Sequence, residues 1–449
     1  MTTAATLIDW DALSQRLSPI EVSTAEKVIK RKSRDYYWFS PVLKAQLEEV
    51  RADAIVTPAS AGEVSQVVRF CVENRLPLTL RGGGTGNYGQ AMPLKGGVVM
   101  DMTRLTAICH IGDGVVRAEA GAKMYDIEQA VNAAGYELRF FPSTWKSATI
   151  GGFVAGGSTG CGAIGFGTLH SGDNVRAAKV LTAEESPRIL ELTGRDAQAV
   201  VHAYGTNGVI LEVELALAPR RAWHDRIVAF DDLPTTLAFA AALGADGAIP
   251  KRQLTIYGAT TASLIRPVAD LDTGACPLVL TMIAEEALPA FDALLAAHGG
   301  RTVFTRAPGE RIPAVPPIFE LGWNHTTLHA LSRDPAISYI QADFGPDWQR
   351  HVIAAAAELG EEAPLHLEMA LIDGALCCFG ISLLRFTSAE RLEEIHQILR
   401  RHGCTIFNPH TYILENGGMQ VADPQQLAFR KEADPLGLCN PGKMPGWDV

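Results

Sequence analysis

Two dense glycine clusters, at residues 82–89 and 149–167, constrain this 449-residue chain more than any other feature. The first cluster reads Gly-Gly-Gly-Thr-Gly-Asn-Tyr-Gly and directly follows a predicted strand that ends in Arg81. Four glycines in five residues exceed what a turn requires, and successive glycine N–H groups can converge on one anion. We therefore predict that the first cluster binds phosphate, with Arg81 at its mouth.

The segments around the first cluster read as alternating strands and helices. Residues 54–81 predict a β-α-β unit, whose helix begins after Ser60 with Glu63 as a capping-box partner. Further predicted elements are strands at 97–102, 115–118, 177–182 and 208–218 and a helix at 124–134. The break at 219–221 closes this part, so we expect a first domain over 1–220 with its core at 50–220.

The middle of the chain has a different rhythm. Predicted strands at 227–230, 253–257, 277–283 and 303–305 alternate with helices at 235–243 and 288–297. Residues 365–371 and 376–384 predict a hairpin around Asp373-Gly374, and 389–402 predict a helix. We therefore expect an α+β fold, in which residues 221–404 form a second domain with an antiparallel sheet flanked by helices and 405–449 form a closing segment.

Composition excludes several classes of protein. The chain is 47% hydrophobic with a net charge of −11, which argues against nucleic-acid binding. The uncharged stretch at 147–172 is too rich in glycine for a membrane-spanning helix. None of the eight cysteines forms a CxxC pair and no positively charged leader begins the chain, so we expect reduced thiols, no metal and a cytoplasmic location.

Two motifs match other enzyme classes literally. The first cluster fits GxGxxG, but a dinucleotide-binding loop must open a helix, and residues 90–95 with Pro93 leave no room for one. Residues 156–160 fit GxSxG, which makes a serine hydrolase with Ser158 as nucleophile an alternative of another class. That motif also requires a helix directly after the serine, and a glycine-rich run follows instead.

Several histidines are candidates for chemistry. His325 and His329 are spaced i, i+4 and would share one face of a helix, as metal ligands or as substrate contacts. His366 and Glu368 would share one face of a strand, as a catalytic pair or as a surface pair. His410 lies in a polar stretch near the closing segment, as a base or as a core histidine.

In their order along the chain, these motifs resemble the FAD-binding domain of the vanillyl-alcohol oxidase / p-cresol methylhydroxylase (PCMH-type) superfamily. The closing run at 434–443, Asp-Pro-Leu-Gly-Leu-Cys-Asn-Pro-Gly-Lys, is similar to the branch that holds the flavin-binding glycolate oxidase chains and the D-lactate dehydrogenases. The other matching stretches are 56–64, 77–86, 142–144, 149–152, 166–167, 174–175 and 208–210.

The resemblance implies FAD as the cofactor. Thr85 stands where covalently flavinylated members often carry histidine, and Ser147 precedes the second cluster where others carry cysteine, so we expect non-covalent FAD. The residues expected at FAD are Arg81, Gly82, Gly83, Gly84, Thr85, Gly86, Asn87, Pro142, Ser143, Thr144, Thr149, Gly151, Gly152, Ala155, Gly156, Ile210 and Asn440.

The resemblance also implies oxidation of an alcohol, a hydroxy acid or a related small molecule by hydride transfer to the flavin. Because histidine titrates near neutral pH, we expect His410 to be the base, with Tyr412, Glu415 and His366 as further candidates. Metal-dependent hydroxy-acid members carry a GHxGDGNxH run, which this sequence lacks.

Other activities and the partners stay open at this stage. A flavin-dependent reductase on the same fold is an alternative, and so is a flavoprotein without redox turnover. The electron acceptor is left open among oxygen, a quinone and a redox protein, and a homodimer is left open as well.

Overall fold

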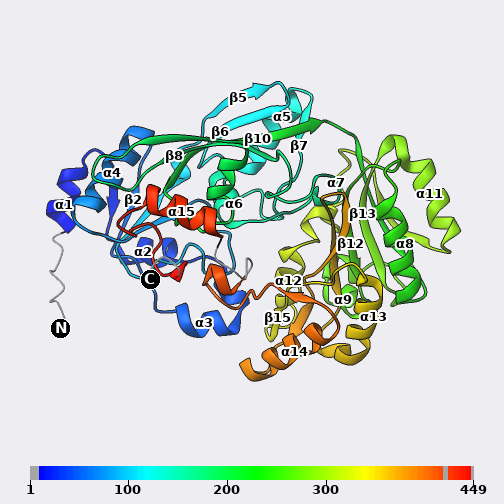
Figure 1. Ribbon diagram of the computed structural model, residues 1–449. Helices are drawn as coiled ribbons and strands as arrows, with labels where there is room; N and C mark the ends of the chain where they lie inside the picture. The colour runs from blue at the N-terminus through cyan, green and yellow to red at the C-terminus, as the bar shows by residue number, and fades with distance from the viewer. Residues whose placement is uncertain (1–9, 418–422, 446–449) are drawn as a thin grey trace.

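The computed structural model describes residues 10–417 and 423–445, which form two parts joined side by side (Figure 1). The first part begins with a four-stranded sheet in the order β1-β2-β4-β3. In it β2, β4 and β3 run parallel, and β1 pairs antiparallel with β2. The strands are β1 (Glu21–Ser23), β2 (Ala54–Thr57), β3 (Leu78–Arg81) and β4 (Val98–Asp101), and the helices before β2 are α1 (Trp10–Leu17), α2 (Glu26–Lys32) and α3 (Pro41–Leu47).

The predicted β-α-β unit is present, with α4 (Ala61–Glu73) as its helix. The Ser60 hydroxyl accepts from the Glu63 N–H at 3.2 Å, as the capping box predicts. The Glu63 carboxylate reaches back to the Ala59 N–H at 2.7 Å, one residue before the expected partner. Buried valines and Cys71 on α4 pack against the parallel strands. The carboxyl end of β3 therefore delivers Arg81 directly into the first glycine cluster.

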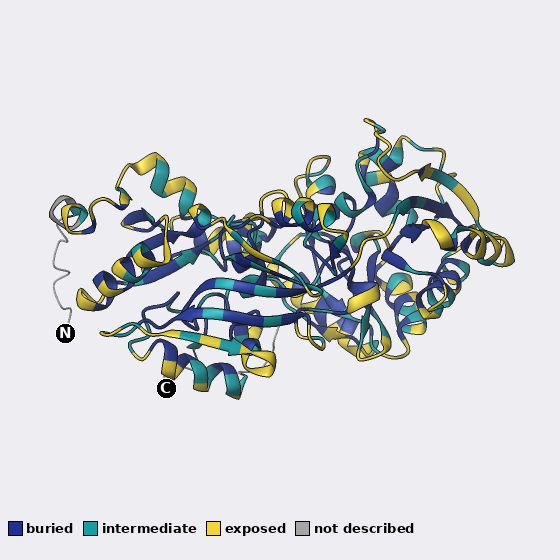
Figure 2. Cartoon of the chain, turned by 90° about the horizontal axis from the view of Figure 1, so that it is seen from above, coloured by how far each residue is buried: buried dark blue, intermediate teal, exposed yellow. Residues whose placement is uncertain are grey.

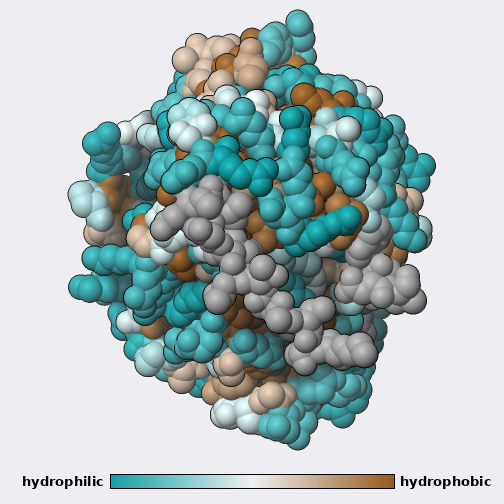
Figure 3. Space-filling view, turned by 90° about the vertical axis from the view of Figure 1, so that its left-hand side faces the viewer, coloured by the Kyte–Doolittle hydropathy of each residue, from teal (hydrophilic) through white to brown (hydrophobic). Residues whose placement is uncertain are grey.

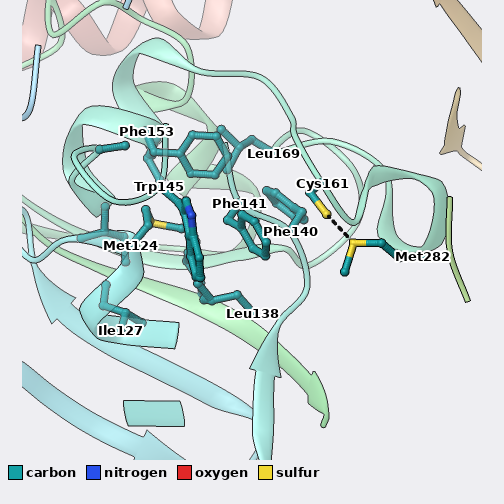
Figure 4. Close-up of a cluster of buried hydrophobic side chains, with 14 of the residues drawn as sticks. Met124, Ile127, Leu138, Phe140, Phe141, Trp145, Phe153, Cys161, Leu169 and Met282 are labelled. Carbon is teal, nitrogen blue, oxygen red and sulfur yellow. Dashed lines mark hydrogen bonds between the residues drawn. The ribbon is translucent and has the colours of Figure 1, made fainter. Parts of the chain in front are cut away.

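A second sheet follows, antiparallel throughout, in the order β5-β6-β10-β8-β9 with β7 also paired to β10. The helices α5 and α6 pack on this sheet, and Figure 4 shows the apolar cluster beneath them, where the rings of Phe141 and Trp145 stack at 4.8 Å. The elements are β5 (Ile108–Gly112), β6 (Val115–Glu119), α5 (Met124–Ala133), β7 (Tyr136–Leu138), α6 (Ile150–Gly156), α7 (Ala163–Phe166), β8 (Val175–Leu181), β9 (Ile189–Thr193) and β10 (Val209–Pro219).

The second part is built on one eight-stranded antiparallel sheet in the order β14-β11-β13-β12-β17-β18-β16-β20. Neighbouring residues on its central strands, such as Val279 and Leu280, belong to different apolar clusters, so the sheet is covered on both faces. The helices α8, α11, α13 and α14 pack in the cluster of Val279, and α9, α10 and α12 in the cluster of Leu280. This arrangement confirms the predicted α+β class with a helix-flanked antiparallel sheet.

Most of the elements predicted in the second part are present within a few residues of their expected bounds, and several further short elements and the helix α13 are added to them. The strands are β11 (Trp223–Ala229), β12 (Lys251–Tyr257), β13 (Leu278–Ala284), β14 (Arg301–Arg306), β15 (Ile337–Tyr339), β16 (Ala342–Asp343), β17 (His366–Ile372), β18 (Ala375–Gly380), β19 (Leu383–Arg385) and β20 (Thr405–Ile406). The helices are α8 (Leu233–Ala245), α9 (Ala259–Leu264), α10 (Arg266–Ala269), α11 (Leu288–Ala297), α12 (Asn324–Leu331), α13 (Trp348–Leu359) and α14 (Ala389–Arg401).

The predicted hairpin forms between β17 and β18. Asp373 and Gly374 both have positive φ, +49° and +80°, which matches the two-residue turns that join twisted strands. The second predicted strand, 376–384, is not continuous. It ends at Gly380, and β19 pairs instead with β15 in a separate two-stranded sheet. The Ile381 N–H still donates to the His366 carbonyl at 3.0 Å, in the register of the β17–β18 ladder. The change of partner follows at Ser382, whose carbonyl accepts from the Ile340 N–H at 2.9 Å.

A buried cation joins the two parts. Arg252 of β12 lies 3.0 Å from Glu128 and 3.6 Å from Glu137, and its guanidinium stands 4.9 Å from the ring centre of Phe141. Beside it Cys161 contacts Met282 at 3.9 Å, drawn in Figure 4. Figure 2 shows buried strands running through both parts beneath more exposed helices. The two parts therefore share a continuous core that fixes their relative position.

The closing segment returns to the first part. Its strand β20 still pairs with β16, but the Asn440 N–H donates to the Leu78 carbonyl at 2.7 Å, beside a parallel bridge between Leu78 and Cys439. Its helix is α15 (Pro424–Ala433). We propose the divisions near 220 and 404 as domain limits, because the chain enters the eight-stranded sheet just after 220 and leaves it with β20, just after 404.

The face of the molecule seen in Figure 3 is mostly hydrophilic, with small scattered apolar areas. Within the described residues, no helix has the length and apolar character needed to cross a lipid bilayer.

Candidate cofactor and substrate site

One cavity of about 460 Å³ lies where the two parts meet. From the first part it is lined by both glycine clusters and by the turn at 202–210. From the second part it is lined by α12, β16, the β17–β18 hairpin and residues 407–408. A nucleotide-sized ligand that follows the glycine clusters would therefore extend toward the second part.

The two glycine clusters pack against each other with no room for side chains. A Cβ at Gly82 would collide with the Thr149 hydroxyl, and one at Gly83 would collide with the Ser147 carbonyl. Gly84 has φ +65°, and a Cβ there would strike the Arg81 guanidinium. The cradle is thus closed to any residue but glycine at these positions, as the predicted phosphate loop requires.

Arg81 supplies the positive charge under this loop. Its side chain is buried, and Nη1 donates to the Arg34 carbonyl at 2.6 Å. Burial lowers the pKa of Arg81, while the carboxylates of Asp35 and Asp101 act in the opposite direction. Because an arginine stays protonated in proteins, the loop rests on a fixed cation that suits a pyrophosphate.

The end of the first cluster is tied to two distant segments. The Asn87 amide donates to the Tyr339 hydroxyl at 2.8 Å, and the Tyr88 hydroxyl donates to Gln341 at 2.8 Å. The Gln90 amide donates to the Gly156 carbonyl at 3.0 Å. The loop therefore holds the second part and the second glycine cluster in place around the cavity.

The second cluster forms α6 and the turn after it. The Thr149 hydroxyl caps α6 by accepting from the Gly152 N–H at 3.2 Å. Sixteen of the seventeen residues expected at FAD line the cavity. They are Arg81, Gly82, Gly83, Gly84, Thr85, Gly86, Asn87, Pro142, Ser143, Thr144, Thr149, Gly151, Gly152, Ala155, Gly156 and Ile210.

Asn440, the seventeenth, is not among the lining residues. Its amide nitrogen donates to the carbonyls of Gln90 at 2.7 Å and Tyr204 at 2.6 Å. It therefore supports two segments that line the cavity instead of facing the cavity itself.

His410 lies outside the cavity lining. Its Nδ1 is 2.7 Å from the Ser40 hydroxyl and its Nε2 is 2.9 Å from the Tyr339 carbonyl, so both ring nitrogens are engaged. Burial and the nearby His396 lower the pKa of His410 to about 3. Tyr412 packs under the Lys443 ammonium at 5.3 Å, and Glu415 lies in a short turn at Leu414–Asn416, both outside the lining.

His366 and Glu368 share one face of β17, as predicted, with 2.8 Å between Nε2 and Oε1. Both side chains are fully buried and neither lines the cavity, so the pair is neither at the surface nor in contact with a ligand there. The Glu368 carboxylate also accepts from the Thr255 hydroxyl at 2.7 Å and the Trp323 N–H at 2.6 Å. The geometry favours a supporting role for this pair beneath Trp323.

His325 and His329 both lie on a helix, α12, but only His325 lines the cavity. Burial and the neighbouring His329 lower the pKa of His325 to about 4. The His329 ring nitrogen faces the Glu320 carbonyl at 3.3 Å. In the described part of the chain, no group of three or more metal-ligating side chains comes together.

Ser158 lines the cavity in a loop between α6 and α7, with no strand before it and no long helix after it. Across the described residues, no histidine hydrogen bonds with its hydroxyl. This geometry lacks the strand-turn-helix and the base that a nucleophilic serine requires.

Several lining residues escaped the sequence reasoning. Tyr36 and Phe39 come from an aromatic run that was visible in the sequence but had no assigned use. The others, which carry no local motif, are His170, His202, Tyr204, Trp323, Asn324, Leu328, Gln341, Ile372, Phe379, Phe407 and Asn408.

Comparisons with known proteins agree with this site. A family model described as "FAD binding domain" (FAD_binding_4) matches residues 52–190. The chain is 28% identical over 179 residues to the glycolate oxidase subunit GlcD of Bacillus subtilis, covering 37% of each chain. It is 30% identical over 197 residues to a mitochondrial D-lactate dehydrogenase (cytochrome) of Arabidopsis thaliana, covering 41% of this chain and 33% of that protein. These matches thus span about a third of each relative.

A solved structure of alkyldihydroxyacetonephosphate synthase superposes with a TM-score of 0.71 at 14% identity, covering 97% of this chain and 84% of that one. At this identity the likeness concerns the fold alone, and it extends over both parts of the chain. Residues 52–190 therefore match the FAD binding domain model on a PCMH-type fold, and the cofactor of this protein is FAD.

Proposed function

We propose that this protein is an FAD-dependent oxidoreductase that oxidises the CH–OH group of a small organic substrate. The observation that carries the proposal is one cavity that joins a glycine cradle, suited to the FAD pyrophosphate, to a space lined by the second part. The names of the curated relatives, an oxidase subunit and a dehydrogenase, support the same reaction type.

The residues around the glycine clusters fit FAD. The cradle at Gly82–Gly84 and the Arg81 cation match a pyrophosphate, and Thr149, Ala155 and Ile210 line the adjoining stretch. Bound FAD would supply an acceptor for two electrons. Thr85 and Ser147 stand at the two family attachment positions, which supports non-covalent FAD.

A proton must leave the substrate hydroxyl when its carbon is oxidised. Because His410 has both ring nitrogens engaged, we propose His325 as the acceptor in its place. His325 is the histidine of α12 that lines the cavity, and its lowered pKa keeps it unprotonated at neutral pH. The second part positions the substrate and shields it from water.

The visible spectrum of the purified protein tests the proposal. We expect a flavin spectrum that a CH–OH donor bleaches under anaerobic conditions, and FAD that acid precipitation releases into the supernatant. A flavoprotein that no donor reduces but NADPH reduces would be a reductase. A colourless protein that reacts with a fluorophosphonate at Ser158 would overturn the proposal. Reoxidation by oxygen, a quinone or a redox protein would then identify the electron acceptor.

A further inference from the structure

We infer that the part of the cavity beneath the second part takes an uncharged alcohol with an apolar body. The inference rests on the proposed function and names its substrate class. It separates this protein from a chain that would oxidise a small hydroxy acid such as glycolate or lactate.

The cavity offers no cation to a substrate carboxylate. Among the described lining residues Arg81 is the only arginine or lysine, and it lies under the glycine loop. The stretches at 1–9, 418–422 and 446–449 contain neither lysine nor arginine in the sequence. A bound carboxylate needs a charged or multiply donating partner to offset its desolvation, so the substrate is not anionic.

The neutral groups of the second part do not replace that cation. His325 has its pKa lowered to about 4, so it carries no charge at neutral pH. The N-terminus of α12 also faces this region, but the backbone N–H of Trp323 there already donates to Glu368. That buried carboxylate occupies the positive end of the helix and would repel a second anion.

A cationic substrate is equally disfavoured, since no aspartate or glutamate is among the described lining residues. The polar side chains of the second part are the neutral amides of Asn324, Gln341 and Asn408 beside His325 and the Trp323 indole. Gln341 accepts from Tyr88 at 2.8 Å, and Asn408 accepts from the His410 N–H at 2.9 Å. These two amides are thus partly engaged within the protein.

The remaining lining is aromatic and aliphatic. Helix α12 lies on the side of the second part that faces the first (Figure 1), and Leu328 of this helix reaches the cavity. Apolar walls of this kind stabilise an apolar ligand by removing its surface from water. The apolar side chains concerned are Tyr36, Phe39, Leu328, Ile372, Phe379 and Phe407.

Trp323 forms a fixed part of these walls. The residue lines the cavity and is 9% exposed, but its indole Nε1 is itself buried from solvent and has no hydrogen-bond partner among the described residues. Its backbone, at φ +53° and ψ −142°, is strained for a tryptophan. The Glu368 and His366 pair holds the residue there, and its buried indole N–H offers no donor at the cavity surface.

The test uses matched donors with the FAD-loaded protein: benzyl alcohol against mandelate, 1-hexanol against 2-hydroxyhexanoate, with glycolate and D-lactate added. We expect the alcohols to bleach the flavin with a kcat/KM at least about tenfold above that of the matching acid. A hydroxy acid that equals or exceeds its alcohol would overturn the inference while leaving the proposed function intact.

If no donor bleaches the flavin, the proposed function fails and binding still tests the substrate class. Benzyl alcohol and mandelate are then titrated against the visible flavin spectrum. Tighter binding of benzyl alcohol supports the apolar chamber, and equal or tighter binding of mandelate overturns it.

One variant with a matched control locates the effect. Leu328→Arg places a cation at the cavity and should raise the ratio of mandelate to benzyl alcohol turnover about tenfold, whereas Ile353→Arg, on the exposed face of α13, should not. An unchanged ratio in Leu328→Arg with FAD still bound would overturn the placement of the substrate beside α12.

Discussion

The backbone N–H of Trp323 donates to the buried Glu368 carboxylate across 2.6 Å, and the residue has a backbone conformation that tryptophan rarely adopts. The same carboxylate lies 2.8 Å from His366 Nε2 and 2.7 Å from the Thr255 hydroxyl. Gly322, just before the tryptophan, has no room for a side chain because a Cβ would approach Gln253 and Glu368. This buried network therefore sets the position of a cavity wall from behind.

Replacing Glu368 by glutamine should disturb that wall. The glutamine would turn an amide donor toward groups that now donate to a carboxylate, and we expect a loss of about 3 kcal/mol in stability. KM for the substrate should rise while FAD content per folded protein stays unchanged. Glu394→Gln is the matched control, since Glu394 makes an exposed ion pair with Arg391. Thermal melts and steady-state kinetics of both variants check the prediction, and equal melting points would contradict it.

The glycine cradle makes a second prediction. Gly82→Ala adds one methyl group that collides with the Thr149 hydroxyl, which caps α6, so either the loop or the start of α6 must shift. We expect FAD affinity to fall about a hundredfold or more, because the loss of several aligned donors exceeds roughly 3 kcal/mol. FAD fluorescence titration of the apoprotein measures the affinity.

Gly247→Ala is the control for this prediction. No heavy atom lies within 4 Å of a Cβ at Gly247, so the same change should leave FAD binding unaltered there. Normal FAD affinity in Gly82→Ala would show that the cradle does not hold the cofactor.

The sequence was sufficient to predict residues that line one cavity at the glycine clusters, because its signals there are local. Ser60 with Glu63, Arg81 with the following glycines and Thr149 before α6 each act on residues within a few positions along the chain. Local patterns of this kind determine caps and loops directly. Sixteen predicted contacts consequently line one cavity.

The substrate end was not predictable in the same way. Its chemistry and its place near the closing motif make His410 the expected base, but its ring nitrogens contact Ser40, 370 residues away, and the Tyr339 carbonyl. Trp323 carries no motif, and its exposure to the cavity depends on a strand 45 residues further along. Contacts between distant segments depend on the packing of the whole fold, which periodicity and spacing do not encode.

His410 gives a prediction for stability against pH. Burial lowers its folded-state pKa to about 3, while an unfolded histidine has an ordinary value near 6.5. Between these two pKa values the unfolded chain binds a proton that the folded protein does not bind. The free energy of unfolding therefore falls as the pH drops through 6.5 toward 3. Between pH 7 and pH 5 this one group should cost about 2 kcal/mol of stability.

In His410→Asn this contribution is absent, so the thermal midpoint should fall less between pH 7 and pH 5 than in the original protein. The variant should also be less stable at pH 7, because Ser40 and Tyr339 lose a partner. His110→Asn, at an exposed position on β5, should keep the original pH dependence. A variant with an undiminished pH dependence would place the titrating group elsewhere.

The proposed proton acceptor is tested at His325. In His325→Gln the ring nitrogen that accepts the proton is gone, and general-base contributions are typically 10²- to 10⁴-fold, so kcat should fall by about two orders of magnitude or more with FAD retained. His329→Gln, one turn further on the same helix but outside the cavity lining, should keep kcat within about threefold.

Because only unprotonated His325 accepts a proton and its pKa is lowered to about 4, kcat/KM should stay level from pH 8 to about 5 and fall as pH approaches 4. Stopped-flow reduction of the flavin across this range measures the chemical step directly. Equal rates in the two variants would assign the proton to another group.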